Sequence, residues 1–166
     1  MARESIQIRP ATRDDADTIV EFNRAMALET ENRQLDLTTL SQGIRAFLEN
    51  SGYGSYIMAE LPEDRSRKPV GQLMITYEWS DWRNGVFWWI QSVYVTPERR
   101  GMGVFRAMYD HILAKANADP KVCGIRLYVE RENRRAQSAY QRVGLSPSCY
   151  IIYEQDFVFD HTISVK

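Results

Sequence analysis

Apolar and polar positions follow distinct spacings along this chain, and these spacings predict its first elements. Residues 5–11 alternate between polar and apolar side chains, which predicts a short strand. Apolar residues then recur at helical spacing from Thr12 to about residue 29, with acidic residues in the first turn. A second apolar stripe predicts another helix, which we expect to open at Thr38 or Thr39.

The middle of the chain has the apolar runs of β-strands. Residues 53–61 and 70–79 each predict a strand, and the polar segment 61–69 with its two prolines predicts a loop between them. Asn84-Gly85 is the strongest hairpin signal in the sequence, because both residue types tolerate positive φ. We therefore expect the chain to return as a third strand of this group.

The last third alternates helices and strands. A helix runs to about Asn117, and residues 124–130 predict a strand. Asn133 can cap a short helix that ends before Gly144, and residues 149–159 predict a last strand. The expected order is β-α-α-β-β-β-α-β-α-β, a mixed and mostly antiparallel sheet flanked by helices within the α/β class.

Composition and charge limit the function classes. The 166 residues are 44% hydrophobic and 26% charged, so we expect residues 1–166 to form one soluble domain. A net charge of −1 argues against a nucleic-acid partner, because phosphate neutralisation needs clustered Lys and Arg. No secretory or membrane-length apolar run is visible, so we expect no membrane partner. Cys123 and Cys149 lack metal spacing, which indicates no metal and reduced thiols in a cytoplasmic protein.

The stretch VYVTPERRGMGVFRAMYDHIL, residues 93–113, runs from a predicted strand through two glycines into a predicted helix. Such a corner can bind an anion through backbone N–H groups. A P-loop is excluded, since Val104-Phe105 follows Gly103 in place of Lys and a hydroxyl residue. A dinucleotide fingerprint is excluded too, since Arg106 stands where the third glycine is required. Alternatively, the glycines only turn a strand into a helix.

A third reading of this corner rests on a family resemblance. Residues 100–104 resemble the acetyl-CoA pyrophosphate loop of the GNAT acyltransferase family, whose usual pattern is Arg/Gln-x-x-Gly-x-Gly/Ala. Arg100 and Gly103 match the first and fourth positions, while Phe105 stands where Gly or Ala is usual. We expect the Phe105 side chain to point away from the pyrophosphate. Residues 128–144 resemble the strand–Asn–helix–Tyr segment of the same family, and the resemblance covers nearly the whole chain.

The resemblance implies the GNAT fold and an acetyl-CoA-dependent N-acetyltransferase that acts by direct transfer in a ternary complex. The hairpin of residues 76–95 and the acidic segment 28–31 look most like the diamine acetyltransferase branch. The implied acceptor is a small primary amine, diamine or amino-acid-like, and a homodimer is an expected assembly. Two alternatives stay open: a non-catalytic acyl-CoA-binding or sensing module, and a protein or peptide N-acetyltransferase.

Amine acetylation has definite chemical needs. An alkyl amine with a pKa of about 10.4 is neutral in only on the order of 1 in 1000 molecules at pH 7, so a base or a chain of waters is useful. The departing thiolate also benefits from an acid. Tyr140 matches the position of the family's thiolate acid. Alternatively, Tyr140 is a core aromatic that packs on the apolar face of its short helix. Gln91 can only orient a water, whereas Glu130 is a candidate proton acceptor or a solvated carboxylate.

The resemblance also implies the contacts of acetyl-CoA. Backbone N–H groups of the strand before the loop would face the acyl carbonyl and the pantetheine amides. Asn133 would contact the CoA arm, cap its helix, or do both. The implied cofactor-binding residues are Val93, Tyr94, Val95, Arg100, Gly101, Met102, Gly103, Val104, Phe105, Arg106, Asn133, Ala136 and Tyr140.

The acceptor would meet the end of the first helix. Glu29 and Glu31 could offer carboxylates to an ammonium group, and Trp79 or Trp82 could offer an aromatic face. Charged helix ends are otherwise simply solvated, and an exposed tryptophan is equally consistent with a dimer contact.

Overall fold

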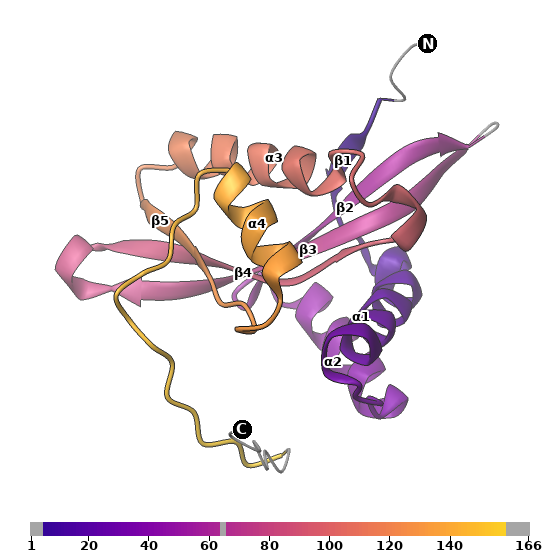
Figure 1. Ribbon diagram of the computed structural model, residues 1–166, viewed down its shortest axis with the longest axis horizontal. Helices are drawn as coiled ribbons and strands as arrows, with labels where there is room; N and C mark the ends of the chain where they lie inside the picture. Colours follow the sequence, from indigo (N-terminus) through magenta and orange to yellow (C-terminus); the bar gives the residue numbers. More distant parts are fainter. Residues whose placement is uncertain (1–4, 64–65, 159–166) are drawn as a thin grey trace.

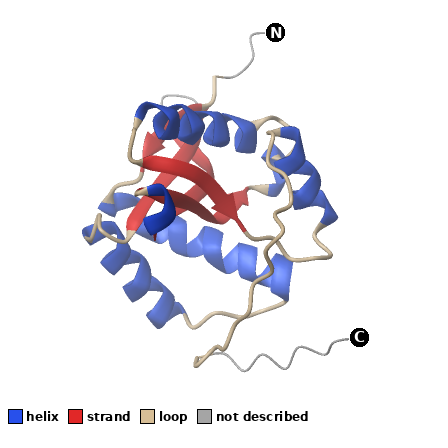
Figure 2. Ribbon diagram, turned by 90° about the vertical axis from the view of Figure 1, so that its left-hand side faces the viewer, coloured by secondary structure: helices blue, strands red, loops and turns tan. Residues whose placement is uncertain are grey.

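The computed structural model describes residues 5–63 and 66–158 of the chain, and within them one five-stranded mixed sheet is flanked by helices (Figures 1 and 2). The strand order is β1-β2-β3-β4-β5, antiparallel except for the parallel pair β4–β5. The elements are β1 (Gln7–Pro10), α1 (Ala16–Glu31), α2 (Leu37–Glu49), β2 (Gly54–Glu63), β3 (Ser66–Ser80), β4 (Gly85–Val95), α3 (Val104–Ala118), β5 (Val122–Leu127) and α4 (Arg134–Arg142). The expected fold class is confirmed.

Each face of the sheet has its own core. Ile57 and Ala59 of β2 pack with α3, whereas Tyr56 and Met58 pack with α1 and α2. This division follows from the two-residue period of a strand, which sends neighbouring side chains to opposite faces. In α3 the buried residues Val104, Met108, Tyr109, Ile112 and Ala116 recur at helical spacing and form the stripe that covers the sheet.

Three boundary predictions were wrong. Helix α2 begins at Leu37, because the Asp36 carboxylate caps it by accepting a hydrogen bond of 2.8 Å from the Thr39 backbone N–H. The predicted loop 61–69 is mostly strand, since β2 and β3 pair as far as Glu63 and Ser66. Polar residues form a strand wherever a neighbour completes the hydrogen-bond ladder. Strand β5 begins at Val122 and ends at Leu127, earlier than residues 124–130.

The predicted last strand is also wrong for the residues described here. Residues 149–158 form no strand, and Tyr150, Ile151, Ile152 and Tyr153 are 62–89% exposed; residue 159 lies outside the described range. Apolar residues of strand type cannot pair without a partner in register, and this segment runs away from the sheet in Figure 1. The element order therefore ends at α4 in the described chain.

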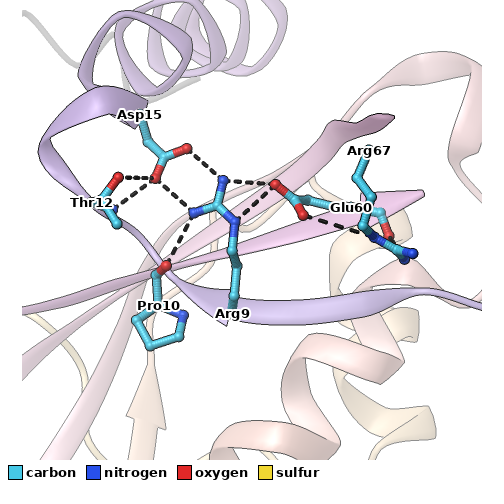
Figure 3. A network of polar contacts seen from close by, with 6 residues as sticks. All are labelled: Arg9, Pro10, Thr12, Asp15, Glu60 and Arg67. Atoms are coloured by element: carbon cyan, nitrogen blue, oxygen red, sulfur yellow. Dashed lines mark hydrogen bonds and ion pairs between the residues drawn. The ribbon is translucent and has the colours of Figure 1, made fainter. Parts of the chain in front are cut away.

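A polar network ties the N-terminal elements together (Figure 3). The Arg9 guanidinium of β1 donates two hydrogen bonds of 2.7 Å to Asp15, just before α1, and one of 2.8 Å to Glu60 of β2. Asp15 also accepts a bond from the Thr12 backbone N–H, so it fixes the turn into α1. Both carboxylates are buried, and a single cation holds three elements together.

Among the described helices, none is both long and apolar enough to cross a membrane.

Candidate active site

A bulge in β4 creates the centre of the site. Gln72 of β3 faces Tyr94, but Met74 faces Gln91, so β4 carries one extra residue between these pairs. Ser92, inside the bulge, has a φ of 48°, a left-handed conformation that is unusual for a residue other than glycine. Pairing between β4 and β5 ends at Ile90. The backbone N–H groups beyond the bulge are thereby released from the β5 side of the sheet.

Buried polar side chains stabilise this bulge through hydrogen bonds. The Gln72 amide donates to Asn23 at 2.9 Å and to the Ser92 carbonyl at 3.4 Å. Asn23 in turn donates to the Tyr56 hydroxyl at 3.2 Å. Burial raises the pKa of Tyr56, while hydrogen bonds with Asn23 and Ser92 act in the opposite direction. The network closes on itself through Ser92 and stabilises its strained backbone.

The glycine-rich loop joins β4 to α3. Gly101 and Gly103 have φ values of 80° and 87°, which L-residues with a Cβ rarely adopt. Gly103 stands at the N-cap of α3 without a side-chain cap, so the first N–H groups of the helix face outward. This combination of a positive helix end and close backbone approach suits an anion.

A cleft of about 870 Å³ lies between β4, the loop and α4. Almost every residue predicted to bind the cofactor lines it; Met102, which is 53% exposed, is the exception. The lining residues among those predicted are Val93, Tyr94, Val95, Arg100, Gly101, Gly103, Val104, Phe105, Arg106, Asn133, Ala136 and Tyr140. Predicted separately as a base, Glu130 lies on the wall of the same cleft, where it accepts a bond from the Glu132 backbone N–H at 2.7 Å.

Arg100 is held by the protein itself. Its guanidinium donates to the Val95 carbonyl at 2.8 Å and to Glu29 at 2.5 Å, and it lies 5.5 Å from the centre of the Tyr94 ring. Burial and the nearby Glu29 carboxylate raise the pKa of Tyr94. Glu29 therefore faces the cleft of the predicted cofactor residues, whereas the sequence placed it with the acceptor.

Helix α4 carries the two predicted residues of the far wall. The Asn133 side chain accepts a bond from the Ala136 backbone N–H at 3.0 Å and also lines the cleft, so capping and ligand contact are compatible. Burial raises the pKa of Tyr140. Its phenol therefore stays protonated to a higher pH than that of a free tyrosine.

A second cavity of about 750 Å³ opens beside the bulge. Phe47, Tyr56 and Met74 contribute apolar surface to its wall, and Ser92 of the bulge also lines it. Met26 of α1 lines both spaces. Charged residues from the end of α1, the α1–α2 connection and the C-terminal segment also line it: Glu31, Arg33, Glu154 and Asp156.

Besides Met102, three predicted residues line neither space. Trp79 and Trp82 are 62% and 85% exposed on the β3–β4 hairpin and line neither cavity. Gln91 donates to Thr76 at 2.7 Å and accepts a bond of 3.4 Å from Tyr128, and it lines neither cavity. Across the described residues, no group of three or more His, Cys, Asp or Glu side chains is placed to hold a metal ion.

Sequence reasoning missed the buried network of Asn23, Tyr56, Gln72 and Ser92. One signal was available: Asn23 lies on the apolar face of the first helix, at a position where a polar side chain needs a buried partner.

The comparisons with known proteins agree with this geometry. The model of the acetyltransferase (GNAT) family matches residues 18–145. A possible acetyltransferase from Clostridium difficile 630 is 42% identical, with a TM-score of 0.84 over 94% of this chain and 100% of that one. No curated protein matches the chain.

Two further solved structures share the fold at lower identity. A predicted acetyltransferase from Clostridium acetobutylicum, solved with acetyl-CoA, is 17% identical over 91% of this chain and 96% of that one, with a TM-score of 0.71. Glucosamine-6-phosphate N-acetyltransferase from Arabidopsis thaliana is 17% identical over 93% and 99% of the two chains, with a TM-score of 0.69.

Proposed function

This chain belongs to the acetyltransferase (GNAT) family, and we propose that it acetylates the primary amine of a small, diamine-like molecule. Acetyl-CoA-dependent N-acetyltransferase activity follows from the family match and from the 42% identical relative. The acceptor and the roles of individual residues form the proposal.

We place acetyl-CoA in the cleft between the loop and α4. The pyrophosphate would meet the loop and the N-terminus of α3, where Gly101 and Gly103 allow close backbone approach. Arg106, Arg135 and Arg142 line the same cleft and add positive charge. The pantetheine arm would then run along Val93–Val95, whose backbone lacks a β5 partner.

Transfer would be direct. The neutral amine attacks the thioester carbon, the C–S bond breaks, and the sulfur takes a proton from Tyr140. Backbone N–H groups at the bulge would stabilise the oxyanion that forms during the attack. The two free cysteines support this route, because neither Cys123 nor Cys149 lines the cleft or the second cavity.

The second cavity is the proposed binding site of the acceptor. It adjoins the bulge, so an amine bound there would lie next to the acetyl group. Three carboxylates against one guanidinium give its rim a negative balance, which favours an acceptor with a second cationic group: Glu31, Glu154 and Asp156 against Arg33. Apolar surface from Phe47 and Met74 suits a methylene chain between the two amines.

Thiol release from acetyl-CoA tests the proposal directly. A panel should contain diamines of increasing chain length, monoamines of equal length, amino acids, an alcohol and a lysine-containing peptide. We expect diamines to give the highest kcat/KM, with acceptor KM rising with ionic strength because exposed charges are screened. Preference for the peptide would replace the small-molecule acceptor, and binding of CoA without turnover of any amine would indicate a sensing module.

We also propose that the chain forms a homodimer. The exposed residues Tyr150–Tyr153 are of strand type, and β5 has only β4 beside it in the described sheet. A second copy could supply the missing partner to each, as strand addition does at sheet edges. Light scattering after size exclusion should give twice the mass of the chain, and a monomeric mass over the micromolar range contradicts the dimer.

A further inference from the structure

Phe105 occupies the loop position where the GNAT pattern has Gly or Ala, and its ring points into the protein. The ring centre lies 6.1 Å from that of Tyr109 and 5.4 Å from that of Tyr140, with a 65° angle between the Phe105 and Tyr140 planes. Tyr109 is 4% exposed and belongs to the core under α3, against which Phe105 also packs. Three rings thus form a row from the core to α4.

Helix α4 has few other anchors. It is nine residues long, and none of its residues is fully buried. Arg106 donates to the Arg142 carbonyl at 3.0 Å, and Val143 and Leu145, after the helix, pack on the core cluster. The Tyr140 hydroxyl makes no hydrogen bond within the part of the chain that the structure describes. The orientation of its ring therefore depends on packing.

We propose that Phe105 is a positioning residue for Tyr140: its ring holds the Tyr140 phenol in the cofactor cleft and keeps water from the face that it covers. This inference rests on the proposed function, in which Tyr140 protonates the departing thiolate. A glycine or alanine at position 105 has no atoms that reach the Tyr140 ring. The departure from the family pattern is thereby linked to the group that performs the proton transfer.

Titration of Tyr140 tests the packing without turnover. In protein labelled at tyrosine Cζ with ¹³C, the Tyr140 resonance is the one that Tyr140→Phe removes. Burial raises the pKa of this phenol, so Phe105→Ala, which lets water reach the ring, should lower the pKa of Tyr140. The charged residues that line the same cleft are unchanged in this variant: Glu29, Arg99, Arg100, Arg106, Glu130, Glu132, Arg135 and Arg142. An unaltered Tyr140 titration overturns the proposal.

A double-mutant cycle tests the link to catalysis. We expect Phe105→Ala to lower kcat roughly tenfold, part of the 10²–10⁴-fold that a general acid typically supplies. In the Tyr140→Phe background the same substitution should change kcat less than about twofold, because Phe105 acts through the phenol. Equal losses in both backgrounds overturn the proposal. If Phe105→Ala fails to fold, Phe105→Leu keeps an apolar side chain and removes the ring.

Different results would disprove the proposed acceptor class and the role of Phe105. If no amine releases thiol from acetyl-CoA, the proposed acceptor class is wrong, and the Tyr140 titration still decides the role of Phe105. If Tyr140→Phe retains the kcat of the wild type, Tyr140 is not the acid and the positioning role is overturned with it, while acetyl transfer to the amine stands.

Discussion

Glu29 at the end of α1 accepts a 2.5 Å hydrogen bond from Arg100 of the glycine-rich loop, and both residues of this ion pair line the cleft between β4, the loop and α4. The two residues are 71 positions apart in the sequence. Glu29 thus lines this cleft, and Glu31, two residues later, lines the second cavity. Neighbouring carboxylates at one helix end therefore face two different cavities.

Glu29→Gln and Glu31→Gln should separate these roles. Glu29→Gln keeps a hydrogen-bond acceptor for Arg100 but removes a negative charge beside the pyrophosphate site. Because exposed ion pairs contribute about 0.2–1 kcal/mol, CoA should bind about 1.4- to 5-fold more tightly by calorimetry. Glu31→Gln should raise acceptor KM and leave CoA affinity unchanged. The assignment of the two cavities is wrong if both variants change the same constant.

Substitution of Gly103 tests whether the glycine-rich loop binds the pyrophosphate of CoA. Its φ of 87° is costly for any residue with a Cβ, although a Cβ placed there has no protein atom within 4 Å. Gly103→Val should therefore fold with a modestly lowered Tm, while its side chain obstructs approach of the pyrophosphate. We expect CoA affinity to fall at least tenfold by calorimetry, against a smaller loss for the control Gly103→Ala. If folded Gly103→Val binds CoA with wild-type affinity, the pyrophosphate does not bind at this loop.

Local sequence was sufficient for features whose cause is local. The positive φ of Asn84 and Gly103 and the Asn133 cap follow from the backbone freedom or the side-chain oxygen of single residues. The strand and helix periods likewise predicted the sheet and the helices that cover it. The pairing of Glu29 with Arg100 could not be predicted in this way, because the meeting of distant residues depends on how α1 packs against β4.

The bulge and the C-terminal segment show the same limit. The run Gln91–Val95 has the composition of a regular strand, and the extra residue at Ser92 is visible only against the register of β3. Likewise, the composition of residues 149–158 favours a strand, but composition does not supply a neighbour to pair with.

Tyr140→Phe keeps the ring packed on Phe105 and removes the transferable proton. We expect kcat to fall by about 10²–10⁴-fold with little change in CoA affinity. Burial raises the pKa of Tyr140, so the phenol stays protonated up to a pH above its ordinary value of about 10. Wild-type kcat should accordingly show an alkaline decline as the pH passes that raised pKa, and this limb should vanish in Tyr140→Phe. An identical alkaline limb in both proteins assigns it to another group.

Tyr56→Phe tests the network behind the bulge. The substitution leaves the buried Asn23 amide without its acceptor, which should cost about 1–3 kcal/mol in the free energy of unfolding. Because the Ser92 side chain loses its hydrogen bond with Tyr56, although Gln72 still donates to the Ser92 carbonyl, kcat should fall more than CoA affinity does. Urea unfolding and steady-state kinetics measure the two effects. Reduced stability with wild-type kcat would confine the network to a structural role.

The Arg9 network allows a prediction that is independent of catalysis (Figure 3). Burial raises the pKa of Asp15, but hydrogen bonds from Arg9 and Thr12 outweigh it and hold the pKa below its usual range. A carboxyl whose pKa is lowered by folding adds stability above its unfolded pKa of about 3.9, and this stability is lost as the pH falls through the lower, folded value. Arg9→Gln leaves the buried Asp15 without a cation and Glu60 with only its 3.9 Å ion pair to Arg67, and it should lower the free energy of unfolding by about 3–5 kcal/mol at pH 7. The loss should shrink in acid, where the Asp15 carboxyl becomes protonated and no longer needs a cation.

Arg13→Gln is the matched control, since its 3.8 Å ion pair with Glu49 is exposed and should contribute less than about 1 kcal/mol. If urea unfolding at pH 7 gives the same loss of unfolding free energy for both substitutions, burial of Asp15 and Glu60 does not make the Arg9 ion pairs stronger than an exposed pair.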